Sequence, residues 1–183
     1  MNKKGGWMLG ISISLVIILI IILFFYFALY KGNNSNSNSI VLKNPVFELS
    51  DEQAIAQFNE SFVLYLLYSV KANQLHNSPL SKDTPKIEIA VGEKIFNAEV
   101  GEGIIFVEER RIQNKDIIIR TNSAEAVKML RDKNYISKSF SSGNSEIELV
   151  AAKSTLFAKG YLNMYTELTG KSVTGNALRI YTS

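Results

Sequence analysis

The chain has 183 residues, no cysteine, one histidine and a formal net charge of +3. Lys3, Lys4 and Lys31 account for the whole positive excess, so the chain from Ile40 onward has no net charge. It therefore lacks the excess of basic residues that is typical of nucleic-acid-binding domains. The lack of cysteine excludes disulfides, cysteine-ligated metals and thiol nucleophiles.

The N-terminal part of the chain is a short basic flank, residues 1–6, followed by an uncharged apolar run over residues 7–30. A helix of that length rises about 36 Å, which exceeds the roughly 30 Å hydrocarbon core of a bilayer. The run is also longer than the apolar part of a cleaved signal peptide. We therefore expect a retained single-pass transmembrane helix, with the lipid bilayer as one partner and a membrane localisation.

Amphipathic and basic residues flank this run, as they do at membrane interfaces. They are Lys3, Lys4, Trp7, Tyr26, Tyr30 and Lys31. Two lysines and the amino terminus precede the run, whereas Lys31 and then Lys43 follow it. The slight positive-inside bias favours an N-terminus in the cytoplasm and an extracytoplasmic soluble domain.

Residues 31–49 are predicted to be a flexible tether and lead-in. The segment from Gly32 to Ser39 holds only glycine, asparagine and serine, which cannot bury apolar surface. The remaining residues, 50–183, are enough chain for one domain with a sizeable core.

Two capping signatures mark helix starts in this domain. Ser50-Asp51-Glu52-Gln53 has the capping-box form, and a strongly apolar helix is expected from there to about Leu75. Asn122-Ser123-Ala124-Glu125 repeats the signature before a short helix. A last amphipathic helix is expected from about Ser154 to Thr169, with Gly170 as its stop.

The hydrophobic period changes to two between residues 86 and 119, with glycine turns at Gly92 and Gly101. This pattern predicts four consecutive strands in an antiparallel meander. A fifth strand is expected over residues 145–150 and a short final one over residues 178–181. The expected fold class is α+β: a mainly antiparallel five-stranded sheet covered by helices.

The chain has few residues suited to catalysis. His76, the single histidine, has no adjacent cluster, and nothing near any serine resembles a nucleophile elbow. Glu146 and Glu148 fall on one face of a predicted strand, which the solvent face of an amphipathic strand also explains. We predict that the protein is not an enzyme and uses no metal or cofactor.

Two stretches resemble the sterol carrier protein type two (SCP-2-like) family. Residues 115–130, KDIIIRTNSAEAVKML, are similar to a family strand that runs into a short helix. Residues 139–149, SFSSGNSEIEL, look like the family's aromatic-x-x-Gly turn and the strand after it. The likeness spans roughly residues 58–168 and departs from the usual family pattern at Asp132-Lys133 and Lys153-Ser154.

The resemblance implies helices and a sheet around an apolar tunnel that takes up a fatty acyl chain, a sterol or another lipid. Candidate lining residues are Phe106, Phe140, Leu156, Phe157, Tyr161 and Met164. Ordinary core packing is the alternative for each of them.

The expected function is a membrane-anchored carrier of a lipid or other apolar ligand. One alternative is a membrane-tethered protein-interaction module with a fully packed core and no ligand. A second is a pilin-like surface subunit, because Lys3-Lys4-Gly5-Gly6 before a long apolar helix resembles a prepilin processing site.

Overall fold

The computed structural model describes residues 18, 20–22, 42–79 and 82–171. The chain divides into two compact units, residues 1–41 and 42–183. In the first unit, residues 18 and 20–22 are helical, and none of the helices in the described ranges has the length and apolar character needed to cross a bilayer. The rest of the predicted span lies outside the described residues, as do its flank residues Lys3, Lys4, Trp7, Tyr26, Tyr30 and Lys31.

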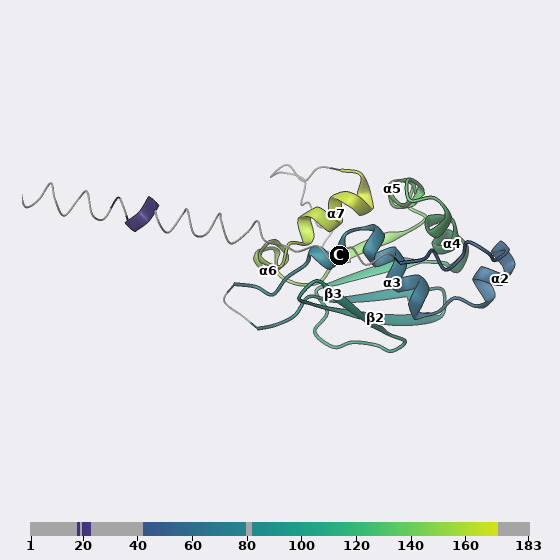
Figure 1. Cartoon of the computed structure of the whole chain (residues 1–183), viewed down its shortest axis with the longest axis horizontal. Helices are drawn as coiled ribbons and strands as arrows, with labels where there is room; N and C mark the ends of the chain where they lie inside the picture. The colour runs from purple at the N-terminus through teal and green to yellow at the C-terminus, as the bar shows by residue number, and fades with distance from the viewer. Residues whose placement is uncertain (1–17, 19, 23–41, 80–81, 172–183) are drawn as a thin grey trace, which may run out of the picture. The chain divides into compact units, whose positions relative to one another are not determined.

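The second unit is an α+β domain with one five-stranded sheet (Figure 1). Its helices are α2 (Asp51–Ala56), α3 (Glu60–Ser69), the 3-10 helix η1 (Ala72–Gln74), α4 (Ser123–Arg131), α5 (Tyr135–Ser141), α6 (Lys153–Ala158) and α7 (Tyr161–Thr169). Its strands are β1 (Lys86–Val91), β2 (Lys94–Gly101), β3 (Ile104–Glu108), β4 (Ile117–Thr121) and β5 (Glu146–Leu149).

The sheet is mixed, with the strand order β3-β2-β1-β4-β5. The pairs β1–β2, β2–β3 and β4–β5 are antiparallel, but β4 runs parallel to β1. The α+β class and the five strands are therefore confirmed. The predictions of a mainly antiparallel sheet and of a four-stranded meander were wrong, because the connection after β3 passes β2 and β1 and places β4 parallel to β1 on its far side.

The composition of β4 explains its central position. All three of its isoleucines, Ile117, Ile118 and Ile119, are buried, although neighbouring residues of a strand point to opposite faces. A strand buried on both faces reads as a continuous apolar run and belongs inside a sheet rather than at its edge. Asp116 fixes the register, since its N–H donates to the Lys86 carbonyl at 2.8 Å.

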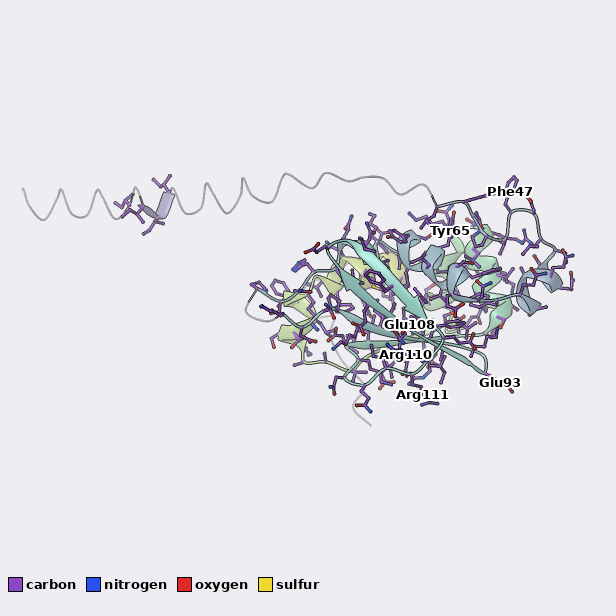
Figure 2. All side chains as sticks on the ribbon, turned by 60° about the horizontal axis from the view of Figure 1, so that its bottom comes forward. Phe47, Tyr65, Glu93, Glu108, Arg110 and Arg111 are labelled. Carbon is purple, nitrogen blue, oxygen red and sulfur yellow. The ribbon has the colours of Figure 1, made fainter. Side chains whose placement is uncertain are left out.

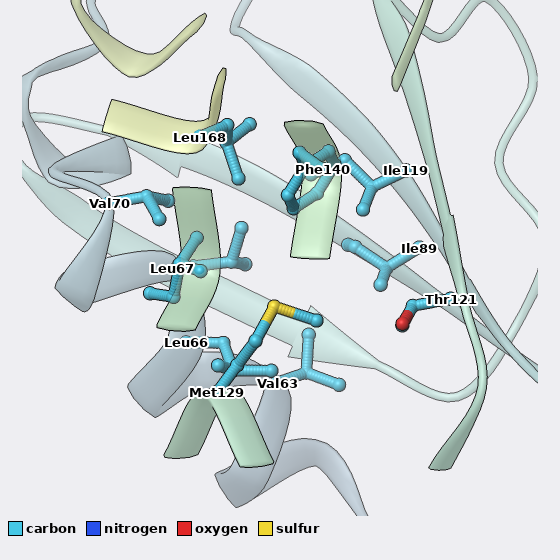
Figure 3. A pocket seen from close by; sticks show the side chains of 11 residues that line it. Val63, Leu66, Leu67, Val70, Ile89, Ile119, Thr121, Met129, Phe140 and Leu168 are labelled. Atoms are coloured by element: carbon cyan, nitrogen blue, oxygen red, sulfur yellow. The ribbon is translucent and has the colours of Figure 1, made fainter. Parts of the chain in front are cut away.

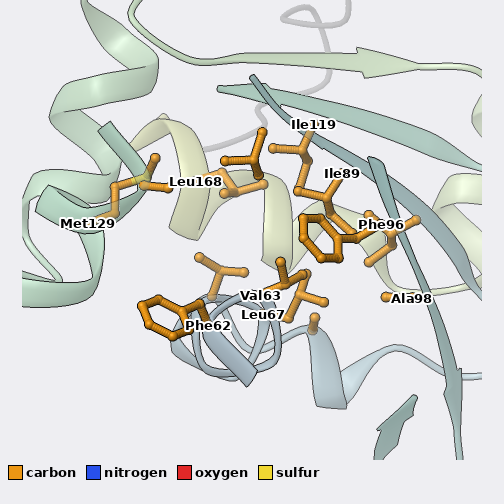
Figure 4. Close-up of a cluster of buried hydrophobic side chains, with 14 of the residues drawn as sticks. Phe62, Val63, Leu67, Ile89, Phe96, Ala98, Ile119, Met129 and Leu168 are labelled. Atoms are coloured by element: carbon orange, nitrogen blue, oxygen red, sulfur yellow. The ribbon is translucent and has the colours of Figure 1, made fainter. Parts of the chain in front are cut away.

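The main core lies between the sheet and the helices α3, α4, α5 and α7. Alternate residues of β1 and β2, among them Ile89 and Phe96, point toward α3, which presents Phe62, Val63 and Leu67 to them (Figure 4). All five of these side chains are buried. This face of the sheet matches the period-two pattern read from the sequence.

The opposite face of the sheet is covered by the connection from β3 to β4, residues 109–116. Asn97 of β2 donates to the Arg110 carbonyl at 3.4 Å, and Lys115 forms an ion pair with the buried Glu88 of β1 at 2.6 Å. Glu108, Arg110 and Arg111 lie together where this connection leaves the sheet (Figure 2). Glu88 and Asn97 are therefore buried beneath an irregular segment, whereas Arg120 and Glu148, farther along the same face, are partly exposed.

Each of the two long predicted helices is broken in the structure. The first breaks between α2 and α3, because Asn59 caps a new helix by accepting from the Ser61 N–H at 2.9 Å. The second breaks at Gly160, whose φ of 84° ends α6 and begins α7. The capping box at Ser50 and the Gly170 stop, by contrast, are confirmed.

The segment that leads into α2 belongs to the domain. Within this predicted lead-in, Val46 is buried and the Asn44 side chain donates to the Leu130 carbonyl at 2.8 Å. Residues 42–49 therefore pack on the domain. The predicted final strand over residues 178–181 lies outside the described residues.

Candidate functional site

An apolar pocket lies in the core between the helices and the central strands of the sheet. Helix α3 and its C-cap residue contribute four lining residues, Val63, Leu66, Leu67 and Val70. Strands β1 and β4 contribute Ile89, Ile119 and Thr121. Helices α4, α5 and α7 contribute Met129, Ile136, Phe140 and Leu168. Figure 3 shows these elements around the pocket, with Val70 and Leu168 at one end and Thr121 toward the other.

The chemistry of this pocket is almost wholly apolar. Thr121 is the single lining residue with a side-chain polar group, and no ionisable side chain takes part. Such walls favour a hydrocarbon group by excluding water from it.

The pocket is small, with a volume of about 40 Å³. Small-molecule sites usually have volumes on the order of 300–1,000 Å³. A long hydrocarbon chain therefore enters only if the walls move apart. Leu66, Met129 and Leu168 have several rotatable bonds, and methionine in particular adapts to different neighbours.

Of the six residues predicted to line a cavity, Phe140 alone is among the residues around this pocket. Leu156, Tyr161 and Met164 are buried in the same hydrophobic core but lie outside the pocket lining. Their assignment to a ligand stays a prediction.

Phe106 and Phe157 are mostly exposed, at 63% and 71%. Strand alternation explains Phe106, because its neighbour Ile105 points into the core and Phe106 therefore points to the other face. In the short helix α6, Leu156 takes the buried position and Phe157 faces outward. Neither phenylalanine lies at the pocket.

Sequence reasoning missed every lining residue except Phe140, and for α3 and α4 the sequence did hold a signal. The signal in the sequence was the width of the apolar stripe on α3, where Val63, Leu66 and Leu67 add to the residues that one core-facing stripe requires. The signal for Met129 was weaker, since a buried methionine on a short helix is ordinary core packing.

A chain of buried hydroxyls leads from the pocket to a carboxylate. Ser145 donates to the Thr121 hydroxyl at 2.7 Å and lies 2.9 Å from the Ser139 hydroxyl, which donates to Glu125 at 2.9 Å. Lys128 donates to Glu125 at 2.8 Å and, more than any other group, lowers the pKa of the Glu125 carboxyl. The carboxylate therefore stays ionised and orients these hydroxyls.

A second polar cluster holds the start of α7. Lys159 is 1% exposed, and its ammonium donates to both Asp116 oxygens at 3.0 Å and to Asp83 at 2.6 Å. The Tyr161 hydroxyl donates to Asp116 at 2.9 Å, and Lys86 supplies a backbone N–H at 2.8 Å. Every charge in this cluster thus has a partner, as buried charges require.

The same contacts determine the ionisation of the cluster. Burial, and then the negative charge of Asp116, raise the pKa of the Tyr161 hydroxyl far above its ordinary value, so it remains a donor. The hydrogen bond from Lys159, followed by that from Lys86, lowers the pKa of the Asp83 carboxyl. With its donors all in use, the cluster stabilises the fold.

Within the described ranges, no further residues are candidates for binding a metal ion or for catalysis. In those ranges no three histidine or carboxylate side chains gather where they could hold a metal ion. The His76 ring lies beside its own loop, 3.0 Å from the Asn77 carbonyl. The predicted absence of a metal and of catalysis remains a prediction.

Comparison with known proteins gives distant structural likenesses, two of which are described below. No protein-family model and no curated protein matches the chain. A solved structure described as a UbiJ-SCP2 ubiquinone synthesis protein is 16% identical with a TM-score of 0.33, and the match covers 59% of this chain and 84% of that one. A sterol carrier protein 2 from Yarrowia lipolytica, in its apo form, is 8% identical with a TM-score of 0.29, and the match covers 66% and 88%. At these values neither likeness assigns a family, so the function has to be inferred from the geometry of the pocket.

Proposed function

We propose that the protein is a membrane-anchored binding domain for an amphiphile with a hydrocarbon chain, which is held between the sheet and helices α3, α5 and α7. The observation that carries this proposal is the apolar pocket, with ten apolar lining residues and Thr121. An apolar run long enough to span a bilayer, residues 7–30, precedes the domain and supports the anchor. A ligand taken from the bilayer would have a short path to such a domain.

Binding requires that the pocket enlarge, and α7 is the wall suited to move. It is a single helix of nine residues, bounded by Gly160 and Gly170, which both have a positive φ. Its Leu168 closes one end of the pocket (Figure 3). Outward displacement of the last turns of α7 would open the pocket without disturbing the sheet.

Photocrosslinking of the full chain tests this proposal. The protein is expressed in cells that are fed a fatty acid with a diazirine in its chain, illuminated, and digested for mass spectrometry. We expect saturable labelling of peptides that carry Leu66, Met129 or Leu168, and competition by unlabelled fatty acid. Labelling confined to the apolar run over residues 7–30 would refute the proposal, because any membrane-embedded helix would be labelled in that way.

The small volume favours a second function, a membrane-tethered interaction module with a filled core. At about 40 Å³, the pocket could be an ordinary packing defect. The exposed aromatic side chains Phe47, Phe106 and Phe157 would then be candidates for protein contact. Absence of labelling in the core peptides, together with a protein captured by in-cell crosslinking at those three positions, would select this function.

Membrane placement is tested separately. We propose a single span with the domain outside the cytoplasm, since Lys3 and Lys4 precede the apolar run. Protease added to intact cells should then degrade the domain, whereas protection in intact cells and digestion after lysis would reverse the orientation. Intact-mass analysis of the N-terminus tests the pilin-like alternative, which requires processing near Gly5-Gly6.

A further inference from the structure

A polar hollow adjoins the apolar pocket at the end where Leu168 and Val70 lie. It has a volume of about 300 Å³ and lies between the end of α3, the α4–α5 turn with the start of α5, and the last turns of α7. We call it the vestibule. Its polar lining residues are Ser69, Lys133, Asn134, Ser137, Thr166 and Glu167.

Two buried side chains are shared between the vestibule and the pocket. Val70, at the end of α3, and Ile136, in α5, line both spaces. They form a thin apolar partition with a polar hollow on one side and an apolar one on the other. Rotation of these two side chains, or an outward shift of α7, would join the two spaces into one elongated amphipathic cavity.

The charges around the vestibule leave one cation available to a ligand. The Glu167 carboxylate is already paired with Lys71 at 2.6 Å. The Lys133 ammonium, by contrast, has neither an ion-pair nor a hydrogen-bond partner in the part of the chain that the structure describes. The remaining polar groups are hydroxyls and an amide, which can bond to a head group of either polarity.

We propose that the vestibule is the entrance of the apolar pocket and that Lys133 selects amphiphiles with a carboxylate head group. This inference rests on the proposed function, since it assumes that a hydrocarbon chain occupies the apolar pocket. The head group would lie at the ammonium of Lys133, and the chain would pass between Val70 and Ile136. A carboxylate gains a charge-assisted hydrogen bond there, which an alcohol of the same length forms only weakly.

A matched pair of probes and variants tests the selectivity. The full chain in nanodiscs is titrated with a diazirine fatty acid and with the corresponding fatty alcohol, and labelling of core peptides is measured. For Lys133→Gln we expect the half-saturating concentration of the acid to rise about three- to tenfold while that of the alcohol stays unchanged. Lys138→Gln is the control, because Lys138 lies in α5 but outside the vestibule.

The outcomes separate this inference from the function on which it rests. If neither probe labels the core of the wild-type protein, the proposed function fails. If both probes label it but Lys133→Gln changes neither, or changes both equally, only the selectivity inference fails. An equal effect of Lys138→Gln would also overturn the inference, because it would point to the general charge of the surface.

The entrance itself can be tested by blocking it, because the chain has no native cysteine. Ser137→Cys places one thiol in the vestibule, and Ser141→Cys places one on the exposed end of α5 as the control. Modification with a bulky maleimide should reduce core labelling at least severalfold in the first variant and leave it unchanged in the second. Unchanged labelling in both modified variants would place the entrance elsewhere.

Discussion

The two ends of α7 are held in very different ways. At its start, the buried ammonium of Lys159 and the Tyr161 hydroxyl both bind Asp116. At its last turns, an ion pair between the partly exposed side chains of Glu167 and Lys71 joins it to the end of α3. A buried and fully paired charge cluster resists separation, whereas a partly exposed ion pair contributes little. The difference favours the outward displacement proposed for the last turns of α7, beside the vestibule, although Leu168 packs in the core there.

The largest expected effect comes from Lys159→Met. This change leaves Asp116 buried without its cation, which costs about 3–5 kcal/mol of the free energy of unfolding. Urea unfolding of the full chain in detergent, followed by near-ultraviolet circular dichroism, measures the loss. A loss below about 1 kcal/mol would mean that water reaches this cluster and that α7 is not fixed at its start.

Tyr161→Phe removes one donor from the same cluster without changing its charges. A hydrogen bond to a charged acceptor contributes about 1.5–3 kcal/mol, and the other donors to Asp116 should compensate in part. We therefore expect a loss of roughly 1–2 kcal/mol in the same unfolding experiment. A loss as large as that of Lys159→Met would show that the hydroxyl, rather than the ammonium, is the main partner of Asp116.

The matched change at the other end is Lys71→Met. It breaks the ion pair with Glu167, whose side chains are 46% and 31% exposed, so we expect less than about 1 kcal/mol of destabilisation. Hydrogen exchange should nonetheless detect it, as faster exchange of the Gly170 N–H, which donates to the Thr166 carbonyl. Exchange equally slow at both ends of α7 would contradict the proposed displacement.

The smallest effect concerns the acid stability of the fixed end. The pKa of Asp83 is lowered in the folded protein, so its stabilisation is complete above the unfolded value near 3.8 and is lost as the pH falls through the folded value. Asp83→Asn should flatten the dependence of unfolding free energy on pH below about pH 4. The effect is modest because Asp83 is half exposed. An unchanged slope would show that its ion pair with Lys159 contributes nothing.

Local signals in the sequence predicted most of the helices and strands. Contacts between residues that lie far apart in the chain could not be predicted from it. The Ser50 and Asn122 caps were readable because a cap and its helix are neighbours in sequence. The pairing of β4 with β1 was not, since strand order depends on contacts across the intervening chain, although the run of three isoleucines was a usable hint.

The candidate site also depends on contacts between residues that lie far apart in the chain. Lys159 stands in an unremarkable Ala-Lys-Gly sequence, and its acidic partners lie 76 and 43 residues earlier in the chain. Phe106 was named from the family resemblance, and the strand alternation of β3 places it on the face opposite the core, where it is 63% exposed. The vestibule could not be anticipated at all, because it arises where three separate helices approach one another.

The ion pair between Asp83 and Lys159 also bears on the order of events during synthesis. Asp83 and Asp116 precede Lys159 by 76 and 43 positions, so β1 and β4 leave the ribosome before the cation that Asp116 requires. Contacts of such long range slow the final folding step. Until Lys159 is in place, Asp116 has the Lys86 N–H as a donor but lacks its buried cation. The charge cluster that holds the start of α7 is therefore completed only after Lys159 has been made.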